Sequence, residues 1–158
     1  MREPQNRISE RGLKVWRITG MIHTFFSLLI TGAVIGLTIF FNWPLWIIAV
    51  ALLLLVIDAY LVIFFIPTLK WKRWRYEVRE NELEIQHGVF IIKRTLVPMI
   101  RVQHVDTRQG PILRKYRLAT VTISTAATVH EIPALDMEEA EELRFFISKL
   151  ARVADDNV

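Results

Sequence analysis

The sequence has no cysteine among its 158 residues, and it has no Asp, Glu, Lys or Arg between residues 18 and 57. The first absence excludes disulfides and thiolate metal sites. The second leaves forty consecutive uncharged residues, which are too many for a buried core helix and enough for two membrane crossings of about 20 residues each. We therefore predict a two-helix transmembrane hairpin within residues 18–66, preceded by a basic segment, residues 1–17.

Two apolar stretches, residues 20–41 and 45–66, form the predicted hairpin, and Asn42-Trp43-Pro44 connects them. So short a connection permits only an antiparallel pair. A signal peptide is the alternative for the first stretch, but the stretch is longer than a typical h-region and no small-residue cleavage site precedes the second stretch.

The basic residues around the hairpin predict its orientation. They lie before the first stretch and after the second, and the connection has none. They are Arg2, Arg7, Arg11, Lys14 and Arg17 on one side and Lys70, Lys72, Arg73 and Arg75 on the other. The positive-inside rule then places both termini in the cytoplasm, with the chain in the cell membrane.

Polar and small residues within the hairpin indicate more than an anchor. Asp58 is ionisable at membrane depth, which makes it a functional candidate, and His23 lies at a similar depth on the first stretch. Asp58 is either a hydrogen-bonded structural residue, a polar contact that specifies assembly, or part of an ion pathway. Gly32 and Gly36 form a GxxxG pattern, which permits close helix packing.

A basic and aromatic segment follows the hairpin directly. Such residues collect at membrane–water interfaces. We interpret it as an interfacial anchor made of Lys70, Trp71, Lys72, Arg73, Trp74 and Arg75.

Residues 67–158 change to a period-two pattern that predicts short antiparallel strands. The expected extended segments are 76–78, 83–86, 89–97, 102–107, 119–125 and 128–132, with a tight turn at His87-Gly88. An amphipathic helix is expected at about 136–153, because Asp136 can cap it and Glu139 stands where a capping box requires it. We therefore expect an α+β cytoplasmic domain, a curled antiparallel sheet covered by its C-terminal helix.

Three segments of this domain resemble the signature of bacterial pleckstrin-homology-like (PH-like) integral membrane proteins, in particular the YdbS-like branch. The segments are residues 98–106, 109–114 and 118–125, and the order of spans and domain also agrees. The resemblance implies a split barrel or strongly bent sheet with a C-terminal capping helix. It also implies a larger companion membrane protein with repeated domains of the same kind.

Catalytic patterns are not found: the sequence has no phosphate-binding glycine loop, nucleophile elbow or HExxH. We therefore expect neither enzymatic activity nor a cofactor or metal. His104 and Asp106 share one side of a strand, and with His130 they are a remote alternative metal site.

Charge is the strongest functional signal outside the hairpin. Residues 1–135 carry 17 basic and 9 acidic groups, whereas residues 136–158 carry 3 and 7. The cations that we predict to contact anionic lipid or another ligand are Lys93, Arg94, Arg101, Arg108, Arg114, Lys115 and Arg117. The alternatives are a solvated face held to anionic lipid, a defined ligand pocket and a protein interface. Nucleic acid is not expected as a partner, because no nucleic-acid motif accompanies the high pI.

Two kinds of function follow from the sequence. In the first, the chain is a non-enzymatic subunit or scaffold that binds a companion membrane protein of the same family. In the second, its domain reads anionic lipid at the cytoplasmic leaflet. Transport, or protection of the envelope against membrane-active compounds, is a weaker third hypothesis, since two spans form a pore only by oligomerisation.

Overall fold

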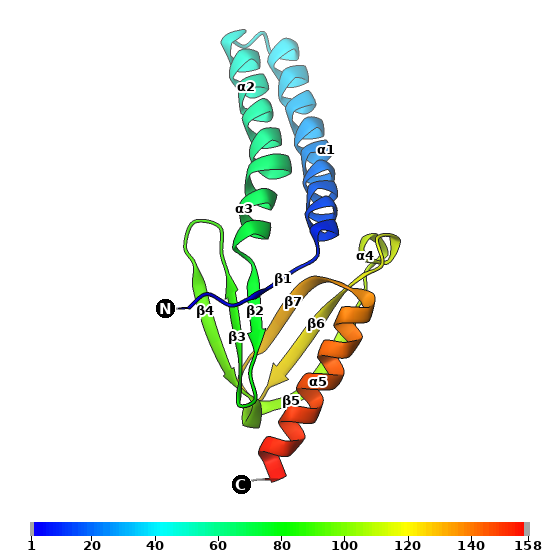
Figure 1. Cartoon of the computed structure of the whole chain (residues 1–158). Coiled ribbons are helices and arrows are strands. Elements are labelled where there is room, and N and C mark those ends of the chain that lie inside the picture. Colours follow the sequence, from blue (N-terminus) through cyan, green and yellow to red (C-terminus); the bar gives the residue numbers. More distant parts are fainter. Residues whose placement is uncertain (1, 157–158) are drawn as a thin grey trace. The chain divides into compact units, whose positions relative to one another are not determined.

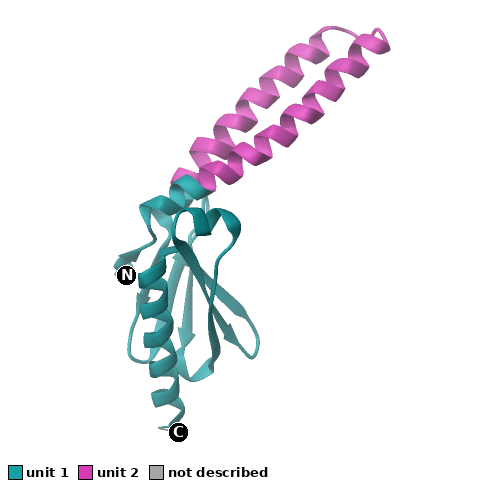
Figure 2. Cartoon of the chain, turned by 90° about the vertical axis from the view of Figure 1, so that its right-hand side faces the viewer, with its two compact units in different colours: residues 1–15, 70–158 teal, residues 16–69 magenta. Residues whose placement is uncertain are grey.

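The computed structural model describes residues 2–156. The chain divides into two compact units, which Figure 2 colours separately. One unit comprises residues 16–69. The other combines residues 1–15 with residues 70–158.

The first unit is a hairpin of apolar helices. Helix α1 (Glu10–Phe40) begins in the second unit, ten residues before the predicted span, and α2 (Trp46–Tyr60) starts after Pro44. A π-helical segment (Leu61–Phe65) and α3 (Ile66–Arg73) continue α2. By length and composition, the α1 stretch and the α2–α3 stretch are each apolar enough to cross a membrane.

The two helices of the hairpin approach closely at Gly20. A Cβ atom at this position would lie 2.5 Å from the carbonyl oxygen of Val62. Val62 belongs to the π-helical segment, whose wider turn displaces backbone carbonyls from regular α geometry. Only glycine permits so close a backbone approach.

The second unit contains two antiparallel sheets (Figure 1). The first has the order β1-β2-β3-β4, with strands Asn6–Arg7, Arg75–Val78, Glu82–His87 and Lys93–Pro98. A 3-10 turn (Met99–Arg101) leads to the second sheet, β5-β6-β7, with strands Val102–Arg108, Leu118–Thr125 and Val129–Asp136. Register irregularities at both β6 pairings bend this sheet.

Helix α5 (Met137–Asp156) packs against β5, β6, β7 and the 3-10 turn. Its buried residues Ala140 and Ile147 join a core that both sheets supply, including Leu83, Ile123 and Leu135. The predicted α+β fold, a membrane hairpin followed by antiparallel sheets and a C-terminal helix, is confirmed.

The sequence predicts a separate N-terminal segment, residues 1–17. In the structure, residues 1–15 instead belong to the domain. Strand β1 pairs with β2, and the side chain of Ile8 is buried. The amide of Ser9 donates to the carbonyl of Ala134 at 3.1 Å. Arg11 pairs with the carboxylate of Asp136, which the sequence assigns to helix capping.

One local prediction is wrong. The β3–β4 turn is not the tight pair His87-Gly88, because β3 runs to His87 and pairs it with Lys93, leaving residues 88–92 as the loop. Four consecutive apolar residues, 89–92, lack the alternation of a half-buried strand and lie outside the ladder. A short helix, α4 (Pro111–Lys115), forms where the sequence predicts no element, since proline suits a first helical turn.

Candidate functional site

Two polar side chains of the hairpin lie close together. Nε2 of His23 lies 3.5 Å from Oδ1 of Asp58, which joins α1 to α2. The two side chains are 56% and 34% exposed on the surface of the chain. The other carboxylate oxygen of Asp58 is buried without a hydrogen-bond partner among residues 2–156. The pair is therefore incompletely satisfied within this chain.

The predicted GxxxG pattern is not used in the hairpin itself. A Cβ atom at Gly32 or Gly36 would meet nothing within 4 Å, in contrast to Gly20. At 100° per residue, Gly32 lies half a turn from His23. The hairpin thus presents two separate surfaces, one with the polar pair and one with the small residues.

Several residues of the predicted interfacial anchor pack inside the domain. Trp71 donates from Nε1 to the carbonyl of Ser9 at 3.1 Å, and Trp74 is buried. Arg73 donates to the carbonyl of Val89, and Arg75 forms a 2.8 Å ion pair with Glu3. The exposed Lys72 remains at the surface, and Lys70 lines a pocket described below.

The seven cations predicted for ligand contact do not form one site. Arg114 and Lys115 lie on α4 and are exposed, as is Arg117, which follows at a positive φ of 54°. Arg108 ends β5, 4.0 Å from Glu131 of β7. Arg101 lies in the exposed 3-10 turn, and the remaining two cations lie on β4 in the first sheet.

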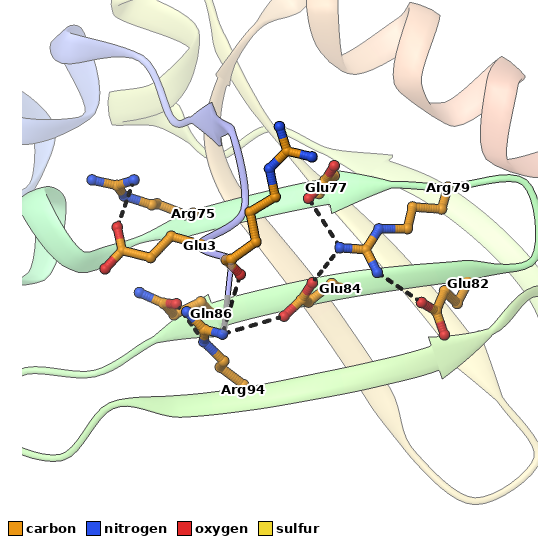
Figure 3. Close-up of polar contacts among 9 residues, drawn as sticks. Glu3, Arg75, Glu77, Arg79, Glu82, Glu84, Gln86 and Arg94 are labelled. Atoms are coloured by element: carbon orange, nitrogen blue, oxygen red, sulfur yellow. Dashed lines mark hydrogen bonds and ion pairs between the residues drawn. The ribbon is translucent and has the colours of Figure 1, made fainter.

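The guanidinium of Arg94 is already engaged within the domain. It donates to Oε1 of Gln86 at 2.7 Å and lies 3.9 Å from the nearly buried Glu84. Figure 3 shows Glu84 between Arg94 and Arg79, whose own distance to this carboxylate is 3.1 Å. Arg94 also donates to the carbonyl of Arg2, so this network holds the N-terminal segment over the sheet.

A basic pocket lies at the base of the β3–β4 loop. Lys70, Trp74 and His87 line it from one side, together with Lys93 at the start of β4, and His130 lines it from β7. The rings of Trp74 and His87 stack with centroids 5.9 Å apart. The pocket brings together two cations that the sequence assigns to different groups. The role of His87 is missed by sequence reasoning, because it depends on the pairing of β3 with β4.

The lining of the pocket carries two lysines and one carboxylate, so its formal charge is positive. Burial lowers the pKa of His87 below its ordinary value of 6.5, and the charges of Lys93, Lys70 and His130 lower it further. Glu131 is the acidic residue in the lining. Burial disfavours a charge of either sign, so the neighbouring cations, which are the smaller cause, are what would favour a bound anion here. Among residues 2–156, no three His, Cys, Asp or Glu side chains gather as a metal site.

Comparisons with known proteins agree with the resemblance seen in the sequence. The family model described as "Bacterial PH domain" matches residues 24–151. The chain is 56% identical over 159 residues to the UPF0699 transmembrane protein YdbS of Bacillus subtilis (strain 168), and the alignment covers 100% of both chains. It is 29% identical over 85 residues to the UPF0699 transmembrane protein YdbT of the same organism, covering 51% of this chain and 17% of YdbT.

No solved structure matches the chain significantly. The family match nevertheless covers most of the chain, and a transmembrane relative aligns with it from end to end. These matches fit the two apolar helices, the antiparallel sheets and the C-terminal helix described above. The chain therefore belongs to the bacterial PH domain family, as a transmembrane member similar to YdbS.

Proposed function

We propose that this chain is a non-enzymatic subunit of a membrane protein complex, and that its hairpin binds a larger companion of the same family. The observation that carries the proposal is the exposed His23–Asp58 pair. An ionisable side chain in a membrane span costs about 3 kcal/mol or more unless it faces protein or water. A companion helix that covers the exposed faces of His23 and Asp58 removes this cost, because it shields both side chains from lipid.

The second line of support is the pair of relatives in one organism. Bacillus subtilis has YdbS, which aligns with this chain over its full length, and YdbT, whose matched segment is 17% of its own length. YdbT therefore has most of its chain outside the shared segment. We infer that a YdbT-like protein is the companion, and that both termini of the present chain lie in the cytoplasm, on the side of the flanking basic residues.

The test is purification of the tagged chain in mild detergent from its native host, at its native expression level, with mass spectrometry of the co-purifying proteins. We expect a YdbT-like membrane protein with the unaltered chain and its loss with Asp58→Leu. Val56→Leu is the matched control, since Val56 is exposed on nearly the opposite face of α2. Purification of the chain alone, or equal recovery of the companion with both variants, contradicts the proposal.

A second function, recognition of anionic lipid, is supported by the basic pocket. Lys70, Lys93 and His130 surround His87 there, and a phosphate between them would raise the pKa of His87. The experiment needs the whole chain, because β1 and the buried Ile8 belong to the domain and a fragment of residues 70–158 lacks them.

The readout is the NMR titration of His87 in nanodiscs with and without phosphatidylglycerol. Anionic lipid should raise the apparent pKa in the unaltered chain, less at high salt and less in Lys93→Ala. Lys115→Ala, which removes an exposed cation from α4, should behave as the unaltered chain. A titration that does not respond to lipid charge rejects the pocket as a lipid site.

A further inference from the structure

The loop between β3 and β4 exposes large apolar side chains in a row. Phe90, Ile91 and Ile92 are 75%, 85% and 51% exposed. Isolated exposed apolar residues are normal in folded proteins, but a contiguous apolar patch marks a surface that binds another apolar phase. The loop, residues 88–92, is therefore a candidate contact site outside the hairpin.

The shape of this loop is fixed by its own backbone. Gly88 has a φ of 142°, which side-chain-bearing residues rarely adopt. A Cβ atom there would also overlap the carbonyl of Ile91. The apolar residues are thus held at the end of a defined hairpin, with β3 and β4 paired from His87 and Lys93 onward.

The loop is attached to the part of the domain that follows the second span. Arg73, the last residue of α3, donates from its guanidinium to the carbonyl of Val89, beside the apolar row. Trp74 stacks on His87, the last residue of β3, immediately before the loop. Figure 1 shows the loop beside the end of α3. Arg73 itself follows the apolar second stretch by only a few residues of sequence, so the segment that holds the loop adjoins the membrane hairpin in the chain.

The charges around the loop fit a lipid surface. Residues 85–105 contain no Asp or Glu, and Lys93 follows the apolar row directly, whereas Arg94 is engaged by Gln86 and Glu84. Lys70, Lys72 and Arg73 add three cations from the segment that Arg73 links to the loop. Apolar side chains flanked by cations are the arrangement by which peripheral segments enter the headgroup and upper acyl region of an anionic leaflet.

We propose that the β3–β4 loop inserts Phe90, Ile91 and Ile92 into the lipid leaflet from which the domain emerges. The loop is then a second membrane contact, made by the domain itself. It restricts how the domain moves about the segment that joins it to the hairpin. This contact does not depend on a companion subunit.

The absence of cysteine permits a direct test with the whole chain. A single cysteine introduced as Ile91→Cys is labelled with an environment-sensitive fluorophore, and the chain is reconstituted alone into vesicles containing phosphatidylglycerol. We expect blue-shifted emission, protection from aqueous iodide and quenching by nitroxides on the lipid acyl chains. The control is Asn81→Cys in the exposed β2–β3 turn, at the other end of β3, which should remain open to iodide and insensitive to the lipid nitroxides.

Each outcome decides the proposal. Equal iodide access at both positions overturns it, because the loop is then in water. A blue shift at position 91 without quenching by lipid nitroxides also overturns it, because a second copy of the chain then covers the loop. Since Ile91 is 85% exposed, its replacement should leave the fold intact, and circular dichroism of both labelled chains verifies this.

Discussion

Docking of the N-terminal segment onto the domain depends on one glycine, and Gly12→Ala tests it. Gly12 lies in the first turns of α1, and a Cβ atom there would be 2.6 Å from the Cβ of Ala134. Ala134 is buried in β7 at a positive φ of 54°, so its backbone has little freedom to retreat. Neither methyl group can rotate away, and the helix must therefore shift.

The expected effect is a difference between two terms. Carbon atoms pack at about 3.5–4.0 Å, so the overlap is roughly 1 Å, and overpacking of this kind costs about 1–3 kcal/mol. Replacing glycine by alanine within a helix stabilises the helix by about 1 kcal/mol. We expect local stability to fall by about 1 kcal/mol net, with the effect on opening greatest at the hydrogen bond from the Ser9 amide to the carbonyl of Ala134.

Native-state hydrogen exchange of the whole chain in detergent is the assay, since it reports local opening. The Ser9 amide should exchange about fivefold faster in Gly12→Ala. The matched control is Gly110→Ala, because Gly110 has a φ of −78° and open space around its Cα. That variant should leave exchange at Ser9 unchanged. Slower or equal exchange in Gly12→Ala would refute the reasoning.

Three further predictions concern the domain. The pKa of His87 is lowered from 6.5, first by burial and then by neighbouring cations, so its contribution to stability is complete above pH 6.5 and is lost as the pH falls below it. The urea midpoint should therefore fall less between about pH 7.5 and about pH 5.5 in His87→Gln than in the unaltered chain. Tyr76→Phe removes the 2.6 Å bond from the buried phenol to Glu139, and the free energy of unfolding should fall by about 1–3 kcal/mol in urea titrations. Trp71→Phe removes the Nε1–H donor to the carbonyl of Ser9. Loss of this hydrogen bond should cost about 1 kcal/mol of local stability, so hydrogen exchange of the β1 amides should become severalfold faster.

The sequence predicts the features that local pattern controls. Forty uncharged residues identify the hairpin, and alternation identifies β2, β3 and β6 within one or two residues. The amphipathic α5 is predicted to begin within one residue of its observed start at Met137. The sequence also places His23 and Asp58 at a similar depth on adjacent helices, and the structure brings their side chains to 3.5 Å.

Features that depend on long-range pairing are not predicted. Strand β1 has two residues and pairs with β2 nearly seventy residues away, so no local pattern marks it. Trp71 and Trp74 satisfy the pattern of an interfacial anchor, yet partners distant in sequence draw them into the domain. Gly20 is the glycine that permits close approach in the hairpin, because it lies on the side of α1 that meets the π-helical segment. The two glycines of the GxxxG motif have open space around them.

The proposed companion interface is tested most directly by photocrosslinking in membranes of the native host. A photoreactive amino acid is placed at Leu54, one helical turn before Asp58 on the same face of α2, or at Val56 on the opposite face. The two side chains are similarly exposed, at 60% and 66%. We predict an adduct with a YdbT-like protein, identified by mass spectrometry, from position 54 and none from position 56. Adducts with lipid alone from both positions, or with the same protein from both, would contradict the account.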